Sequence, residues 1–404
     1  MHICHVITRL IIGGAQENTV LTCRGLVERG HRVTLIAGPE TGPEGSLWDQ
    51  ASKAGCDLIT VKPLRRAVRP LSDWRARREL RHIFERIHPD VVHTHSSKAG
   101  IVGRSAAARA GVPVIIHTIH GMSFNRTQPK SVQMFYRFLE RQVARHTSVF
   151  VSVADAMTDQ AVAAGLAPRD PFVTIRSGME TDRFAPQADL RVRFRRKWGV
   201  TDDQVVVGTI ARLFENKGYE DIIAAMPSAV ARRPKLRFVW IGDGAHRDRY
   251  QRQLEAMGFS DHVHMVGLIS PDEVASHLNG FDIVLHASRW EGLPRAVVQG
   301  LLTEVPAISF DNDGAPEVVI PEETGILVPY GDTQRLADAI VTLAADAELR
   351  RTLGRRGRTR CATTFDWHKM VTDLETLYRR LADRRAPGKA AQSTISNPQS
   401  TMSN

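Results

Sequence analysis

The stretch VVVGTIARLFENKGYEDIIAAMPSAV, residues 205–230, contains the unit that decides the fold of this chain. Its first residues form a continuous Val/Ile run, which predicts a strand buried on both faces. The apolar spacing after Gly218 predicts a helix. Between the two, Arg212 and Lys217 fall on a loop at the carboxyl end of the strand. A strand, a loop and a helix in this order indicate a parallel α/β sheet.

The same alternation of strand-like and helical patterns continues along almost the whole chain. Seven strand candidates precede the segment 176–192, and six follow it. Two such series predict two doubly wound domains, 1–180 and 181–364, whose sheets face a central cleft. Residues 365–384 predict a terminal helix. Residues 385–404 are rich in Pro, Ser and Asn and predict a disordered tail.

The net charge of +10 over 404 residues indicates an anionic partner. Much of the excess lies in residues 62–90, where apolar residues recur at helical spacing. A solvated helix face with core contacts is the simpler interpretation, and attraction to anionic lipid is the alternative. No nucleic-acid module is recognisable, so we expect no nucleic-acid partner. No run is long enough to span a membrane and no signal-peptide pattern is seen, so we expect a cytoplasmic protein.

A second loop of interest is SRWEGLPRAVVQG, residues 288–300, which also follows a strand candidate. Pro294 suits the first turn of a helix, and Gly292 would let the backbone approach a ligand closely. Glu291 could accept hydrogen bonds from ligand hydroxyls, and Gln299 could reach a ribose. The alternatives are an ordinary acid at a helix N-terminus and a polar residue at a helix edge.

These two loops together resemble those of the retaining glycosyltransferases of family four, which have the GT-B fold. The family's Arg-x4-Lys-Gly loop is matched by Arg212, Lys217 and Gly218, and its first Glu-Gly-Leu/Phe-Pro/Gly segment by residues 291–294. The family's second glutamate is replaced by Gln299. The segments 242–244, 311–319 and 323–332 resemble other loops of the family. The resemblance covers residues 1–384 and implies a C-terminal helix that returns to the first domain.

The resemblance also implies roles for particular residues. Arg212 and Lys217 would bind the pyrophosphate of the donor, and Glu291 would hold its sugar. Gln299 would hold the ribose more weakly than a carboxylate, by about 1 kcal/mol. The expected donor-binding residues are Gly14, Arg212, Lys217, Gly242, Glu291, Gly292, Leu293 and Gln299. The expected catalytic residues are His120, Glu291, Arg212 and Lys217.

The first half supplies the candidates for acceptor binding. Gly13 and Gly14 follow the first strand candidate and would allow a diphosphate or acceptor to approach. No dinucleotide-binding fingerprint is present, which disfavours an NAD enzyme. Ser97 and Lys98 begin a loop-to-helix segment and are the other acceptor candidates.

Histidines gather at two successive strand ends, at positions 93, 95, 117 and 120. They lack the usual spacing of a metal site, so we expect no metal and assign part of them to the core. His120 precedes a glycine at its strand tip and matches the active-site histidine of the family.

The predicted function is a retaining, metal-independent hexosyl- or N-acetylhexosaminyltransferase without a cofactor. It would use a nucleotide-diphosphate sugar, with a UDP-sugar as the first choice, and a glycoconjugate, polysaccharide or lipid-linked acceptor. An anionic inner membrane face is a further candidate partner. The acidic residues 311–313 resemble a metal motif of another class, but we interpret them as structural or acceptor-facing. The alternatives are a GT-B-fold epimerase and a non-catalytic protein that binds nucleotide sugars or polyanions.

Overall fold

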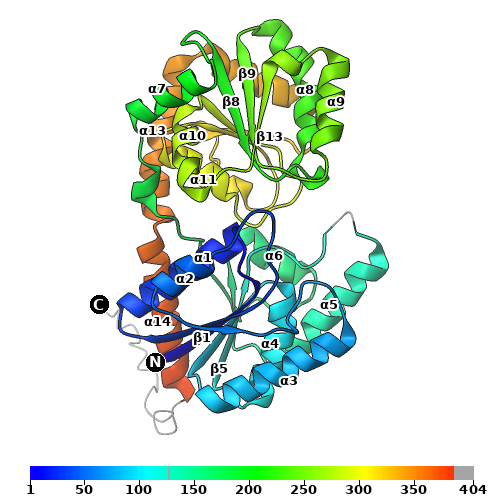
Figure 1. Ribbon diagram of the computed structural model, residues 1–404, viewed down its shortest axis with the longest axis vertical. Helices are drawn as coiled ribbons and strands as arrows, with labels where there is room; N and C mark the ends of the chain where they lie inside the picture. The colour runs from blue at the N-terminus through cyan, green and yellow to red at the C-terminus, as the bar shows by residue number, and fades with distance from the viewer. Residues whose placement is uncertain (126–127, 386–404) are drawn as a thin grey trace, which may run out of the picture.

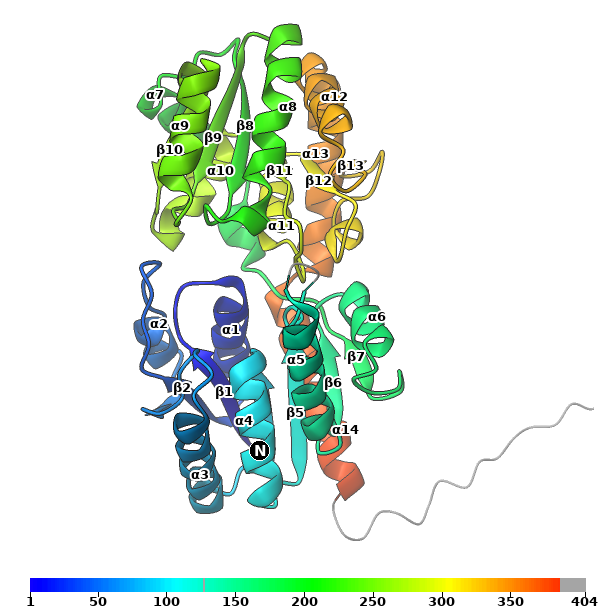
Figure 2. The ribbon, with the colours of Figure 1, turned by 90° about the vertical axis from the view of Figure 1, so that its right-hand side faces the viewer.

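The structure is a computed structural model that describes residues 1–125 and 128–385. Figures 1 and 2 show two α/β domains stacked end to end, with the C-terminal helix lying along the first domain. Residues 386–404, nearly all of the segment predicted to be a disordered tail, lie outside the described range.

The first domain is built on a seven-stranded parallel sheet with the order β3-β2-β1-β4-β5-β6-β7. Its strands are β1 (His2–Arg9), β2 (Arg32–Gly38), β3 (Asp57–Thr60), β4 (Val91–His95), β5 (Val114–Ile119), β6 (Val149–Ser152) and β7 (Phe172–Thr174). The helices that connect them are α1 (Gly14–Glu28), α2 (Trp48–Lys53), α3 (Pro70–Ile87), α4 (Ser97–Arg109), α5 (Lys130–Ala144) and α6 (Asp155–Ala163). The central strands β4 and β5 are buried along their whole length, as the Val/Ile runs predict.

The second domain has a six-stranded parallel sheet with the order β10-β9-β8-β11-β12-β13. Its strands are β8 (Val205–Ile210), β9 (Leu236–Ile241), β10 (Val263–Gly267), β11 (Ile283–His286), β12 (Ala307–Phe310) and β13 (Gly325–Val328). Its α-helices are α7 (Ala188–Lys197), α8 (Tyr219–Arg232), α9 (Arg247–Met257), α10 (Val274–Gly280), α11 (Arg295–Leu302), α12 (Thr333–Ala345) and α13 (Ala347–Thr364). Five short 3-10 turns complete it: η1 (Thr181–Phe184), η2 (Glu215–Lys217), η3 (Ser260–His262), η4 (Pro271–Glu273) and η5 (Ala315–Glu317).

The chain crosses twice between the domains, and the two crossings pair with each other. Met179 donates a backbone hydrogen bond to the Phe365 carbonyl at 2.8 Å, and Trp367 donates one to the Met179 carbonyl at 3.2 Å. The last helix, α14 (Trp367–Arg385), then packs on α1 of the first domain. Its buried side chains Val371 and Tyr378 join the core formed by α1 and the first sheet. The expected return of the C-terminal helix is therefore confirmed.

One apolar cluster continues from the first domain into the second. It contains Phe150 and Met157 on one side and Phe281 and Leu301 on the other, all of them buried. Because this shared core joins the domains, the sheets keep their carboxyl ends facing a common cleft. No helix among the described residues is both long enough and apolar enough to cross a membrane.

Candidate active site

A cavity of about 500 Å³ lies between the domains, at the carboxyl ends of both sheets. The first domain contributes residues from β1, α1 and the loop after β5. The second contributes residues from the loops after β8, β9 and β11, as expected of a ligand site in parallel α/β sheets. Among the residues expected from the sequence, those that line the cavity are Gly13, Gly14, His120, Arg212, Lys217, Gly242, Glu291 and Leu293.

Lys217 and Glu291 form an ion pair in this cavity. Lys217 ends the turn η2, Glu291 lies in the loop after β11, and their Nζ and Oε2 atoms are 2.5 Å apart. Burial by itself would raise the pKa of the Glu291 carboxyl. The positive charge of Lys217 and its hydrogen bond to the carboxylate outweigh the burial, so the pKa is lower than usual and the carboxyl is ionised at neutral pH.

The loop that carries Glu291 is held from behind by the acidic segment 311–313. The backbone amide of Glu291 donates to Asp313 Oδ2 at 2.8 Å, and Asn312 donates to the carbonyls of Ser288 and Arg289. The other carboxylate oxygen of Asp313 accepts a 2.7 Å hydrogen bond from Gln160 on α6. These contacts agree with the structural interpretation of this segment.

Arg212 reaches across the cleft toward the first domain. Its Nη1 atom lies 3.5 Å from Glu44 Oε1, and its guanidinium lies 5.0 Å from the centre of the Phe214 ring. Its side chain is 45% exposed, so it is free to move toward a ligand. Arg9 lies in the same part of the cavity. Burial lowers the pKa of Arg9, and the positive charges of Arg66 and Arg212 lower it further.

Gly292 is the point where the donor-side loop meets the first domain. A Cβ atom at this position would lie 2.0 Å from the carbonyl oxygen of His120. Any side chain would therefore push the two loops apart. The glycine allows a close approach, as the sequence predicts, but the group that approaches in this structure is the protein backbone.

Arg295, the first residue of α11, is a cleft residue that the sequence analysis missed. Its guanidinium donates to the Gly178 carbonyl and to Glu17 Oε2, both at 3.0 Å. A Cβ atom on Gly14 would lie 2.6 Å from Arg295 Cδ, so this glycine makes room for the arginine. Both partners are more than 100 residues away in the sequence, and no local pattern could have paired them with Arg295.

The remaining predicted residues lie elsewhere. Gln299 is half-buried and lines an adjoining cavity of about 690 Å³, which shares Gly14 and Arg295 with the first. Ser97 and Lys98 do not line this cleft but a separate hollow on the first domain.

Two family models together match most of the chain. The model described as "Glycosyl transferase 4-like domain" matches residues 13–178, and "Glycosyl transferases group 1" matches residues 191–360.

The chain is a group 1 glycosyltransferase.

Curated relatives agree with this assignment along most of the chain. The "Putative glycosyltransferase EpsD" of Bacillus subtilis is 29% identical over 80% of this chain and 84% of its own length. The Escherichia coli "UDP-Gal:alpha-D-GlcNAc-diphosphoundecaprenol alpha-1,3-galactosyltransferase" is 26% identical over 93% of this chain and 96% of its own length. Neither name supports an epimerase or a non-catalytic binding protein.

The fold is shared with solved glycosyltransferase-like structures. Anabaena Alr3699/HepE, solved in complex with UDP-glucose, aligns with a TM-score of 0.80 at 19% identity, covering 94% of this chain and all of the other. The predicted GT-B fold is thus confirmed.

His120 of the transferase is the end of a chain of hydrogen-bonded imidazoles. His5 Nδ1 lies 2.9 Å from His95 Nε2, and His95 Nδ1 lies 3.0 Å from His120 Nε2. Because a neutral imidazole carries a single N–H, both bonds must run in the same direction. The buried His5 Nε2 has no partner among the described residues, and an unpaired acceptor costs less than an unpaired N–H. We infer that His5 Nδ1 donates to His95 Nε2 and that His95 Nδ1 donates to His120 Nε2. His120 therefore carries its hydrogen on Nδ1.

The other two clustered histidines are core residues. His93 contacts the Tyr378 hydroxyl and Thr118 Oγ1, both at 2.6 Å, and His117 contacts Thr94 Oγ1 at 2.9 Å. His5, His93 and His95 offer nitrogens close enough together to hold a metal ion. Both nitrogens of His93 are already hydrogen-bonded, which argues against that use.

Stability should fall steeply in mild acid. Burial lowers the pKa of His5 to about 3, and it also lowers the pKa of His120 to about 3. Below about pH 6.5 the unfolded chain binds protons at these positions and the folded chain does not, so each such histidine removes about 1.4 kcal/mol per pH unit. In His5→Asn, the slope of the unfolding free energy against pH from 4 to 6 should drop by that amount. Urea unfolding at a series of pH values measures it.

The matched control is His368→Asn, because His368 is exposed on α14. This variant should keep the wild-type slope. An unchanged slope in His5→Asn would mean that His5 is protonated in the folded protein.

Proposed function

We propose that this glycosyltransferase moves a hexosyl or N-acetylhexosaminyl group from a UDP-sugar with retention of configuration and without a metal ion. The observation that carries the proposal is the Lys217–Glu291 ion pair in the interdomain cavity, across from His120. The choice of UDP is supported by the UDP-sugar named for the E. coli relative and by the UDP-glucose complex of the Anabaena protein.

The ion pairs of the cleft suggest how a donor would be held. Lys217 would exchange Glu291 for the donor diphosphate, and Arg212 would exchange Glu44 for it. Glu291 would then be free to accept hydrogen bonds from the hydroxyls of the donor sugar. The N–H at Nδ1 of His120 would donate to the same sugar. The two cations would neutralise the diphosphate, which is the role that Mg²⁺ has in other transferases.

The transfer step follows from this arrangement. The bond between the anomeric carbon and the diphosphate oxygen breaks, and the electron pair leaves with the diphosphate. The acceptor hydroxyl forms its bond on the same face of the sugar, and its proton passes to the leaving phosphate oxygen. Arg212 and Lys217 would stabilise the charge that develops on that oxygen.

The acceptor is proposed to be a saccharide carried on a lipid, as part of polysaccharide or lipopolysaccharide synthesis. The E. coli relative is named for an acceptor linked to diphosphoundecaprenol. The basic helix α3 would hold the enzyme at an anionic inner membrane face. Leu71 on α3 is 78% exposed and Trp74 is 50% exposed, which suits a helix lying at a lipid interface.

Lys217→Met and Glu291→Gln should each lower the rate of UDP release from UDP-glucose, UDP-galactose or UDP-N-acetylglucosamine by a factor of about 10² to 10³. The first removes the charge that stabilises the leaving diphosphate, and the second weakens the hydrogen bonds to the donor sugar. The loss should fall on kcat more than on KM. A coupled assay for UDP measures both. EDTA should leave the wild-type rate unchanged, and NMR should show the α-anomer as the first product.

Two surface variants are the controls for this assay. Lys235 is paired with Asp203 at the start of the second sheet, and the half-exposed Glu323 lies 3.7 Å from Arg360. Lys235→Met and Glu323→Gln should keep the wild-type rate. Equal rates in Lys217→Met and the wild type would refute the proposed role of the pair.

Gln299→Glu should tighten UDP binding about fivefold, since the binding free energy of a ribose diol is about 1 kcal/mol more favourable with a carboxylate than with an amide. Titration calorimetry with UDP measures the change, and inorganic pyrophosphate serves as the ligand without a ribose. Equal gains for both ligands, or none for UDP, would place Gln299 away from the ribose.

Binding to vesicles that contain phosphatidylglycerol should weaken about 30-fold in Arg75→Gln/Arg78→Gln on α3, because each cation near an anionic surface contributes about 1 kcal/mol. Co-sedimentation at increasing salt measures it. Arg351→Gln/Arg355→Gln on α13 of the second domain is the matched control. If binding does not depend on salt and is equal in the wild type and the α3 variant, the proposed binding to an anionic membrane is wrong.

A further inference from the structure

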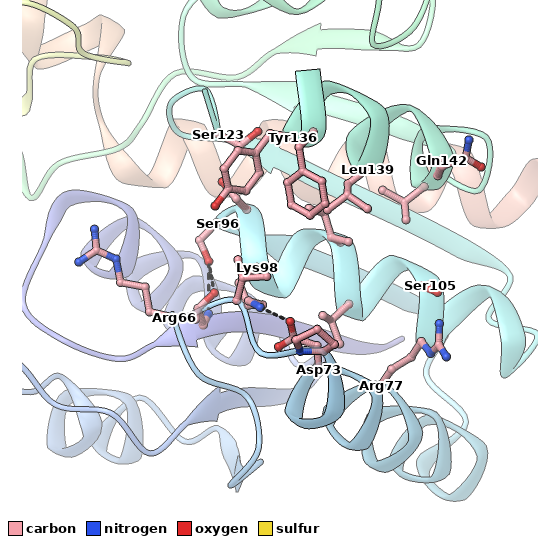
Figure 3. A pocket seen from close by; sticks show the side chains of 18 of the residues that line it. Arg66, Asp73, Arg77, Ser96, Lys98, Ser105, Ser123, Tyr136, Leu139 and Gln142 are labelled. Carbon is pink, nitrogen blue, oxygen red and sulfur yellow. Dashed lines mark hydrogen bonds and ion pairs between the residues drawn. The ribbon is translucent and has the colours of Figure 1, made fainter. Parts of the chain in front are cut away.

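A hollow of about 800 Å³ runs along α4 in the first domain (Figure 3). Its floor is one face of α4, with residues spaced three or four apart: Ser97, Lys98, Ile101, Val102, Ser105 and Arg109. One wall is α3, with Pro70, Asp73, Trp74 and Arg77, and the other is α5, with Phe135, Tyr136, Leu139, Gln142 and Val143. We call this hollow the α4 groove.

The α4 groove is bordered by apolar side chains that face water. Val68, Trp74 and Phe135 line it and are 50%, 50% and 45% exposed. Leu71, Met134 and Phe138 lie on the helices α3 and α5, outside the groove lining, and are exposed as well. These six are the majority of the ten large hydrophobic side chains exposed in the described part of the chain. Exposed apolar side chains in the lining and on the two helices that wall the groove indicate an apolar ligand.

The same groove carries an excess of positive charge. Six cations line it: Arg9, Arg66, Arg77, Lys98, Arg109 and Arg145. Asp73 is the single carboxylate among its described lining residues, and it pairs with Lys98 at 2.5 Å. Figure 3 shows Lys98 and Asp73 pointing toward each other between α4 and α3, with Arg77 farther along the groove. The ligand should therefore be anionic as well as apolar.

The α4 groove adjoins the interdomain cleft. Arg9 and Gln16 line both. At the same end of the groove, Thr8 Oγ1 and Ser96 Oγ are 2.7 Å apart, where β1 meets the start of α4. A ligand lying in the groove could thus extend one end toward His120 and Glu291.

We propose that the α4 groove binds the lipid phosphate of the acceptor, an assignment that rests on the proposed function. The phosphate lies at the cleft end, near Arg9 and Lys98, and the hydrocarbon chain runs along Ile101 and Leu139. This order follows from the chemistry of the acceptor, because the sugar is attached beyond the phosphate and must reach the cleft. The groove thereby selects acceptors that are both charged and lipid-linked.

Titration of farnesyl diphosphate into the full chain, with UDP saturating the donor site, tests the assignment. Leu139→Gln and Trp74→Ala should each raise the Kd at least tenfold, because they remove the apolar walls. Lys98→Met should raise it for farnesyl diphosphate but not for farnesol. Val192→Gln on α7 and Lys62→Met, which lie outside the groove lining, are the matched controls and should stay within twofold of the wild type.

Three results would overturn the assignment: no binding of farnesyl diphosphate, equal Kd values in groove and control variants, or full displacement by inorganic pyrophosphate. UDP binding measured on the same samples separates this test from the proposed function. If UDP binds and farnesyl diphosphate does not, the groove assignment fails alone. If UDP does not bind the wild type, the donor proposal fails.

Discussion

The interdomain cleft depends on the close contact between the Gly292 loop and the carbonyl of His120. A Cβ atom on Gly292 would lie 2.0 Å from that carbonyl oxygen, so the contact exists only because the residue is glycine. The apolar cluster shared by the two domains lies behind it. Together they hold the carboxyl edges of two parallel sheets face to face, which is where this architecture places its ligands. This contact also fixes the position of Glu291 in the cleft, because Glu291 directly precedes Gly292 in the chain.

The charges in the cleft are arranged in pairs that a ligand can replace. Lys217 is paired with Glu291, Arg212 with Glu44, and Arg295 with Glu17. A partly buried charge without a partner is costly, so these carboxylates stabilise the cations of the cleft. The three pairs differ in geometry. Arg212 is half-exposed and its contact is long, whereas Arg295 is mostly buried and also holds the Gly178 carbonyl. Arg212 and Lys217 are therefore suited to exchange partners, and Arg295 to join the domains.

Much of the fold could be predicted from the sequence, because buried parallel strands show as Val/Ile runs and their ends share one edge. The same rule predicts that Lys217, Glu291 and His120, which follow strand ends, lie near one another, and all three line one cavity. Contacts between the domains could not be predicted, since Arg295 and Glu17 are joined by tertiary packing alone. Lys98 shows a related limit. The sequence placed it near an acceptor, but not in the separate groove between α3 and α5 that it lines.

The most direct test of the account is a crystal structure of the protein with UDP-glucose. We expect a phosphate oxygen within hydrogen-bonding distance of Lys217 Nζ, and the Glu291 carboxylate separated from Lys217 and in contact with the glucose hydroxyls. Electron density for the nucleotide elsewhere, with the 2.5 Å contact between Lys217 and Glu291 intact, would contradict it.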